Sequence, residues 1–113
     1  MKRTDKQFIE DIMDCIRTIQ YYLRDCSLND LQNDRMRKDA IIRNYQVIGE
    51  AASRVTEITK KKYPEINWRE MKSMRNFLIH QYSEITTKTL FETSQNVLPN
   101  QLELLKNIDL NTI

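Results

Sequence analysis

The sequence has very few residues of the kinds that form tight turns or bind metals: one Gly, two Pro, two Cys and one His among 113 residues. A Walker-type phosphate-binding loop needs at least two glycines and the dinucleotide fingerprint needs two or three, so both are excluded. The scarcity of turn residues also disfavours an all-β sandwich. Cys15 and Cys26, with His80 as the single imidazole, match no common zinc spacing. We therefore expect no metal site within one chain and no cofactor.

Long apolar runs and a secretory leader are also lacking. No uncharged stretch approaches the ~20 apolar residues of a membrane span. The N-terminal Met-Lys-Arg-Thr-Asp-Lys has no apolar region of the kind that export signals contain. These absences predict a cytoplasmic protein with reduced thiols and no association with membranes.

The composition that remains is typical of a globular domain. Lys and Arg total 18 against 16 Asp and Glu, and 40% of the residues are hydrophobic. The length favours one domain covering residues 1–113. Residues 41–82 contain eight cationic and four acidic side chains, a net charge of +4. This excess is compatible with a polyanionic partner but is too modest to establish one.

Apolar residues recur at helical spacing through nearly the whole chain. One stripe predicts a helix over about residues 4–25, and Ser27 with Asp30 has the spacing of a capping box. A second stripe starts at Ile41 and extends to Val55 and Ile58, before the break imposed by Pro64.

Two further helical stretches follow. Asn67 is a candidate N-cap for a helix that reaches about residue 81, and residues 83–87 read as a polar connector. The last stretch covers 87–108 with Val97 facing inward, and Pro99 must kink or split it. The pattern predicts an all-α protein, an antiparallel bundle of four or five helices.

The segment Arg75-Asn-Phe-Leu-Ile-His-Gln-Tyr82 concentrates the reactive side chains. Imidazole titrates near neutrality and can act as general base or acid, and guanidinium fits phosphate oxygens. With Asn76 in support, Arg75 and His80 suit metal-free RNA cleavage, in which a ribose 2′-OH attacks the adjacent phosphate. One chain has one His, so both proton transfers by imidazole require a homodimer with two copies of His80 in one cleft. The alternative is that His80 is a surface residue or a partner of the helix dipole.

This segment resembles the Arg-x4-His-x-Tyr motif of HEPN-domain proteins, in particular the HepT-like toxins. Two flanking blocks resemble the same family, namely residues 42–51 and residues 63–71. The resemblance implies an all-α homodimer and a metal-independent endoribonuclease toxin of a type VII-like toxin–antitoxin pair. It implies that Arg75 and His80 are catalytic with Asn76 assisting, and that RNA is the substrate. It also implies a nucleotidyltransferase antitoxin, MntA-like, that silences the toxin by transferring AMP to Tyr82.

Two other functions stay open on the sequence. The chain could be a non-catalytic helical module that binds a nucleotide or substrate, or that partners a nucleotidyltransferase. It could also be a plain dimerisation protein, with Gly49, Ala51 and Ala52 at a close helix contact. Neither alternative predicts RNA turnover.

Overall fold

The chain folds into an elongated helical bundle about 43 Å long. The computed structural model describes residues 2–78 and 83–113, and for residues 75–77 it describes the backbone only. Within these residues there are seven α-helices and no strand, which confirms the all-α prediction. The helices are α1 (Asp5–Leu23), α2 (Leu28–Gln32), α3 (Arg35–Arg54), α4 (Glu57–Lys62), α5 (Trp68–Phe77), α6 (Glu84–Asn96) and α7 (Leu98–Lys106). A 3-10 turn, Leu110–Thr112, follows α7.

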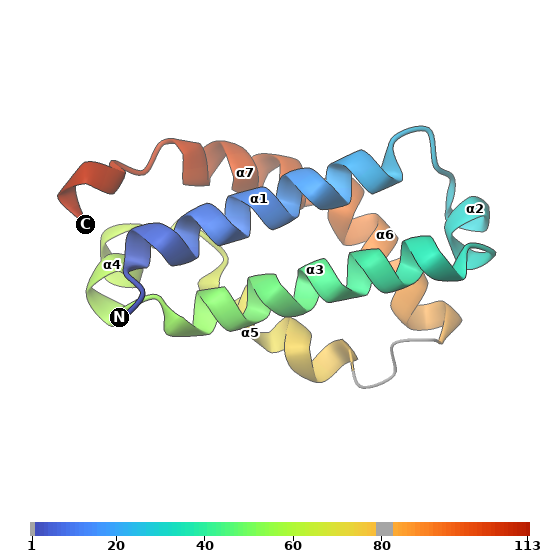
Figure 1. Cartoon of the computed structure of the whole chain (residues 1–113), viewed down its shortest axis with the longest axis horizontal. Coiled ribbons are helices and arrows are strands. Elements are labelled where there is room, and N and C mark those ends of the chain that lie inside the picture. The colour runs from blue at the N-terminus through green and yellow to red at the C-terminus, as the bar shows by residue number, and fades with distance from the viewer. Residues whose placement is uncertain (1, 79–82) are drawn as a thin grey trace.

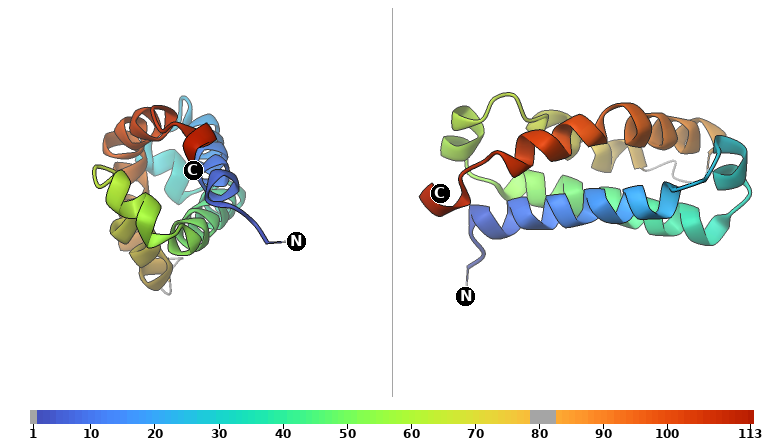
Figure 2. Two further views of the ribbon diagram at one scale, coloured as in Figure 1. Left: turned by 90° about the vertical axis from the view of Figure 1, so that its left-hand side faces the viewer. Right: turned by 90° about the horizontal axis from the view of Figure 1, so that it is seen from above.

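The two longest helices, α1 and α3, lie antiparallel and side by side (Figure 1). Helix α5 packs on another side of α3, while α6 and α7 close the bundle against α2 and α1. Seen end-on, these helices surround a common interior (Figure 2). The core is built from branched aliphatic side chains that are almost fully buried: Ile9, Ile12, Ile16, Ile19, Leu31, Ile41, Ile48, Leu90 and Leu105.

One polar group in this core is satisfied internally. The hydroxyl of Tyr45 on α3 lies 2.6 Å from Oγ of Ser94 on α6, and that Oγ also donates to the carbonyl of Leu90. Burial raises the pKa of Tyr45, partly opposed by the hydrogen bond to Ser94, so the phenol remains protonated at all ordinary pH values. The contact joins α3 to α6 across the interior.

The predicted helix boundaries hold at several points. The helix α1 spans Asp5–Leu23 within the predicted 4–25, and α2 starts behind the Ser27–Asp30 capping box. The predicted start at Trp68 is confirmed. Pro99 splits the last stretch by standing in the first turn of α7, where its missing N–H has no consequence. Among the described residues, no helix is long and apolar enough to cross a membrane.

The predicted bundle of four or five helices corresponds to the longer helices α1, α3, α5, α6 and α7, to which the described residues add the short α2 and α4. The second stripe, however, is interrupted. The long helix ends at Arg54, Val55 and Thr56 are extended, and the short α4 follows. The break changes the register, so that Ile58 is 82% exposed and not part of the core. Its cause is distant in sequence: the carboxylate of Asp5 accepts hydrogen bonds from the backbone N–H of Thr56 and from the hydroxyls of Thr56 and Thr59.

Two expectations near the last helices are also wrong. Residues 83–87 are not a connector, because α6 begins at Glu84 and buries Thr86 and Thr87. Val97 is 37% exposed, because it lies at the junction between α6 and α7. In both places a helix begins or ends at a position that the average hydropathy of the sequence does not reveal.

Candidate active site

Helix α5, whose last turn contains the first residues of the motif, is anchored at its own first residue. Trp68 is buried, and its indole Nε1 donates to the carbonyl of Tyr63 at 2.9 Å. The backbone N–H of Asn67 donates to Oε1 of the buried Gln101 on α7 at 2.8 Å. Met71 continues the buried face, and α5 packs mainly on α3. The start of α5 is therefore fixed to two other parts of the bundle.

The motif begins where α5 ends. Arg75 and Asn76 occupy its last turn, Phe77 is its final residue, and Leu78 follows as a buried 3-10 residue. His80 and Tyr82 lie outside the described residues. The structure thus places Arg75 and Asn76 on adjacent positions of one helix end, and the relation of His80 and Tyr82 to them stays a prediction.

The chain after the motif is fixed again at once. Oγ of Ser83 accepts the N–H of Thr86 at 3.1 Å and caps α6, and Oγ1 of Thr87 donates back to the carbonyl of Ser83. The four residues that include His80 and Tyr82 therefore connect a buried Leu78 to a capped helix start. The sequence does contain the signal for this cap, a Ser before a Glu-Ile-Thr-Thr run, although the polar, β-branched character of the run favours a connector.

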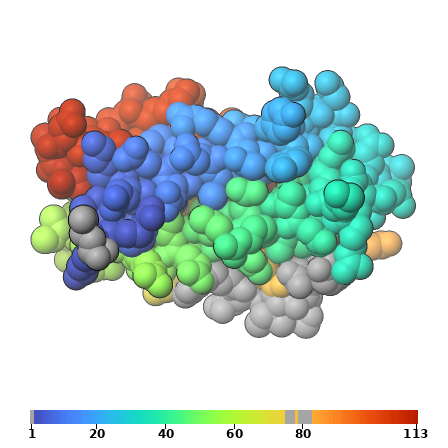
Figure 3. All heavy atoms as spheres, in the orientation of Figure 1, coloured from blue at the N-terminus to red at the C-terminus, as the bar shows by residue number. Residues whose placement is uncertain are grey.

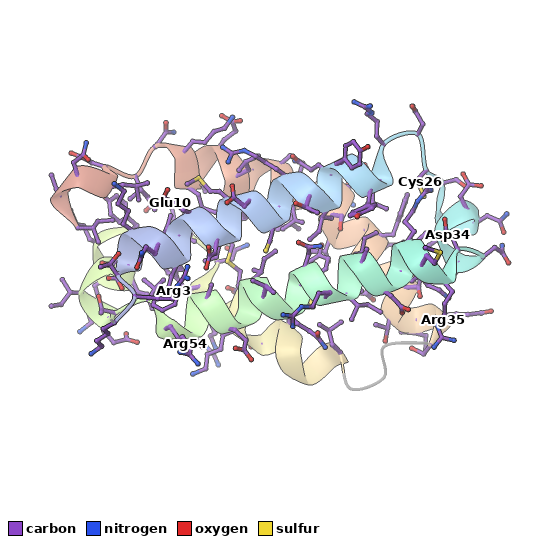
Figure 4. The ribbon with its side chains drawn as sticks, in the orientation of Figure 1. Arg3, Glu10, Cys26, Asp34, Arg35 and Arg54 are labelled. Atoms are coloured by element: carbon purple, nitrogen blue, oxygen red, sulfur yellow. The ribbon has the colours of Figure 1, made fainter. Side chains whose placement is uncertain are left out.

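The larger hollows lined by described residues do not adjoin the motif. One groove of about 590 Å³ lies between α1 and the outer side of α3, and its charged lining includes Arg3, Asp11, Arg43, Glu50 and Arg54. Figure 4 shows Arg3 and Arg54 at the end of the molecule where α1 begins and α3 ends. The surface here is formed by α1 and α3 side by side (Figure 3). Arg3 is held by Asp11 and lies over the ring of Phe8, so its charge is already matched.

A smaller groove of about 350 Å³ lies beside the helix that enters the motif. Its walls are Arg69, Glu70, Ser73 and Met74 of α5 and Thr89 of α6. Sequence reasoning did not select Arg69 or Lys72 of this helix. The signal that finds them is the helical spacing counted backwards from the motif, since positions 69, 72 and 76 fall on one side of a helix.

Neither a metal centre nor a thiol nucleophile emerges from the parts of the chain that are described. Across residues 2–78 and 83–113, no three His, Cys, Asp or Glu side chains gather as a metal ion would require. Both cysteines are free. Burial, reinforced by Asp11 and Asp14, raises the pKa of Cys15 to about 11, so this thiol stays protonated near neutrality.

Comparison with known proteins gives a consistent result over nearly the whole chain. The sequence model of the family described as "Ribonuclease HepT-like" matches residues 12–108. A Thermococcus cleftensis protein named "Probable ribonuclease HepT" is 36% identical over 100 residues, covering 88% of this chain and 91% of the relative. Two Methanocaldococcus jannaschii proteins, named "Putative RNase MJ0125" and "Putative RNase MJ0127", are 35% and 30% identical. Those alignments cover 87% and 96% of this chain, and 84% and 93% of the two relatives. No match was found among solved structures.

Proposed function

Because the chain belongs to the HepT-like ribonuclease family, we propose that it is an endoribonuclease whose active centre is the Arg75–Tyr82 motif. The observation that supports this assignment best is positional. The only His of the chain follows four residues after the Arg75–Asn76 pair in the last turn of α5, and three residues before the Ser83 that caps α6.

The proposed reaction needs a base, an acid and a cation. One imidazole of His80 removes the proton of a ribose 2′-OH, whose oxygen forms a bond to the adjacent phosphorus. The bond from phosphorus to the 5′-oxygen breaks, and that oxygen takes a proton from the protonated imidazole of a second His80. Arg75 stabilises the charge that builds on the phosphoryl oxygens, and Asn76 orients the phosphate or the imidazole. The products are a 2′,3′-cyclic phosphate and a 5′-hydroxyl end.

Two imidazoles require two chains, since each chain contains one His. We therefore include a homodimer in the proposal, with both copies of the motif facing one cleft. The family resemblance stated above supports the same arrangement.

We propose that transfer of AMP to Tyr82 silences this activity. In the proposed reaction its phenol oxygen attacks the α-phosphorus of ATP on a partner nucleotidyltransferase, and pyrophosphate leaves. The product places a bulky anion two residues from His80, where it repels the RNA phosphate and occupies its space. The chain would thus be the toxin of a toxin–antitoxin pair.

One set of preparations tests both parts of the proposal. Wild type, His80→Ala and Arg75→Ala are incubated with single-stranded RNA in the presence of a chelator, and the termini of the products are identified. We expect both variants to cleave RNA at least ~100-fold more slowly than the wild type, the scale of one general acid–base group for His80 and of one charge-stabilising group for Arg75. Cleavage that survives His80→Ala would refute the active centre. Intact mass after co-expression with the nucleotidyltransferase should show added AMP that disappears in Tyr82→Phe.

The same data decide the non-catalytic alternative. A wild-type chain that never turns RNA over, yet still receives AMP on Tyr82, would be a substrate module of its nucleotidyltransferase.

A further inference from the structure

Helix α5, which leads into the motif, contains two cationic side chains that have no role in the proposed reaction. Arg69 and Lys72 are exposed, and the described part of the chain gives neither side chain a hydrogen bond or an ion pair. Together with Asn76 they occupy positions i, i+3 and i+7, which lie on one side of a helix. This side is distinct from the one that carries the buried Met71.

Many cations elsewhere in the molecule are neutralised by an acidic neighbour. Seven cationic side chains have acidic partners within 4.0 Å: Arg3, Arg17, Arg35, Arg37, Lys60, Lys88 and Lys106. Arg69 and Lys72 are among the cations outside these seven pairs, because none of the described acidic side chains lies within that distance of their charged groups. Arg69 precedes Arg75 by six positions, about 9 Å along the helix axis. The uncompensated positive charge therefore lies close to the motif.

The groove beside α5 adds a place for a ligand next to these cations. Arg69 forms its edge, and the half-buried Met74 with Thr89 of α6 supplies an apolar floor. The Ser73 hydroxyl donates to the carbonyl of Arg69, so its proton is already engaged within the helix. Lys72 is not part of the groove lining and lies three positions further along α5. A groove lined by one cation, with a second cation next to it on the same helix, suits an extended chain with phosphates on one side and bases on the other.

We propose that Arg69 and Lys72 bind phosphates of single-stranded RNA on one side of the cleaved bond, and that the groove between α5 and α6 holds the adjoining nucleotide. The inference rests on the proposed function, because it assigns these residues to the substrate of the same site. Glu70 lines the groove as well, and its carboxylate weakens the binding of phosphate. Substitutions on this surface should therefore weaken RNA binding when they remove a cation and tighten it when they remove the carboxylate.

The test measures binding of a fluorescent single-stranded 2′-O-methyl RNA, which cannot be cleaved because its 2′-oxygen is blocked. We expect Arg69→Gln/Lys72→Gln to weaken binding about tenfold and to lower the slope of log K against log salt by ~0.7 for each phosphate that is no longer neutralised. Glu70→Gln should tighten binding. Lys61→Gln is the matched control, since it removes one exposed cation from α4 and should change nothing.

Cleavage of unmodified RNA then separates the two proposals. The double variant should raise KM at least fivefold with kcat nearly unchanged, because Arg69 and Lys72 bind outside the reacting bond. Unchanged binding and KM in the double variant, or weakening as large in Lys61→Gln, would overturn the inference. A changed oligomeric state with unchanged RNA affinity would overturn it too and assign the surface to a protein contact. Binding with the expected salt slope but no cleavage by the wild type would refute only the proposed function.

Discussion

At the residue scale, Asp5 is a side chain whose ionised form supports the fold through hydrogen bonds to a distant segment. It lies in the first turn of α1 and caps α4, whose own N-cap residue, Thr56, makes no side-chain cap hydrogen bond. Partial burial opposes the charged form, but hydrogen bonds from Thr56 and Thr59 and the nearby Lys60 outweigh it and lower the pKa of Asp5. The carboxylate therefore stabilises the native state in its ionised form.

The sign of the pH effect follows from this lowered pKa. Stability from Asp5 is fully present above the unfolded value near 3.8 and is lost as the pH falls through the lower folded pKa. Asp5→Asn should cost about 1 kcal/mol of unfolding free energy at pH 7, the typical value of a helix cap. Denaturant unfolding between pH 2 and pH 7 should show the two proteins converging as the medium becomes acidic.

The control is Glu10→Gln on the same helix, which removes an exposed carboxylate that makes no hydrogen bond or ion pair with the described residues (Figure 4). Its pH profile should parallel that of the wild type. A constant gap between wild type and Asp5→Asn down to pH 2 would contradict the assigned role of the carboxylate.

Local caps can be predicted from the sequence, and distant ones cannot. Ser27 and Asp30 are three residues apart, and that spacing alone predicts their mutual hydrogen bonds. Asp5 and Thr56 are separated by 51 positions, and only the antiparallel packing of α1 on α3 brings them together. The same holds for Tyr45 and Ser94, where an apolar stripe predicts the burial of the ring but not the partner of its hydroxyl.

At the element scale, the position of α5 depends on α7. The buried side chain of Gln101 accepts the N–H of Asn67, the residue before the helix, and so links the two elements. Gln101→Met keeps the volume but removes the acceptor, which leaves a partly buried N–H without a partner. We expect a loss of about 1–3 kcal/mol in unfolding free energy and faster hydrogen exchange at the Asn67 amide.

Gln95→Met is the matched change on α6, because that glutamine is exposed and has no hydrogen bond within the described ranges. It should leave the unfolding free energy within ~0.5 kcal/mol of the wild type and the hydrogen exchange of the Asn67 amide unchanged. Equal effects of the two substitutions would show that the Gln101 hydrogen bond does not hold the start of α5.

The elements themselves follow from periodicity wherever no polar residue from another helix intervenes. The long apolar stripe of α1 and the start of α5 are predicted correctly for this reason. The break at Val55–Thr56 escapes prediction because the isolated sequence continues its helical pattern into Ile58. For the candidate site, the sequence supplies the residue types of the motif. The structure adds the anchoring of Leu78 and Ser83 on either side of residues 79–82.

At the scale of the whole molecule, the single imidazole per chain makes the proposed activity a property of a pair of chains. Cleavage needs a proton acceptor and a proton donor, and one His80 cannot be both within one step. The specific activity should therefore decline on dilution in proportion to the fraction of dimer, which is measured on the same samples by light scattering or sedimentation.

Mixing provides the stricter form of this prediction. Wild type unfolded and refolded with an equal amount of His80→Ala distributes at random among symmetric and mixed pairs. If both imidazoles are required, mixed pairs are inactive, and the total activity falls to about half that of the wild type refolded alone. Lys61→Gln, added in the same amount, should form active pairs both with the wild type and with itself, so the total activity should about double. If the His80→Ala chains leave the activity unaffected, each protomer cleaves RNA with its own imidazole. The second proton-transfer group would then belong to another side chain of the motif, and the Tyr82 phenol would be the first to test.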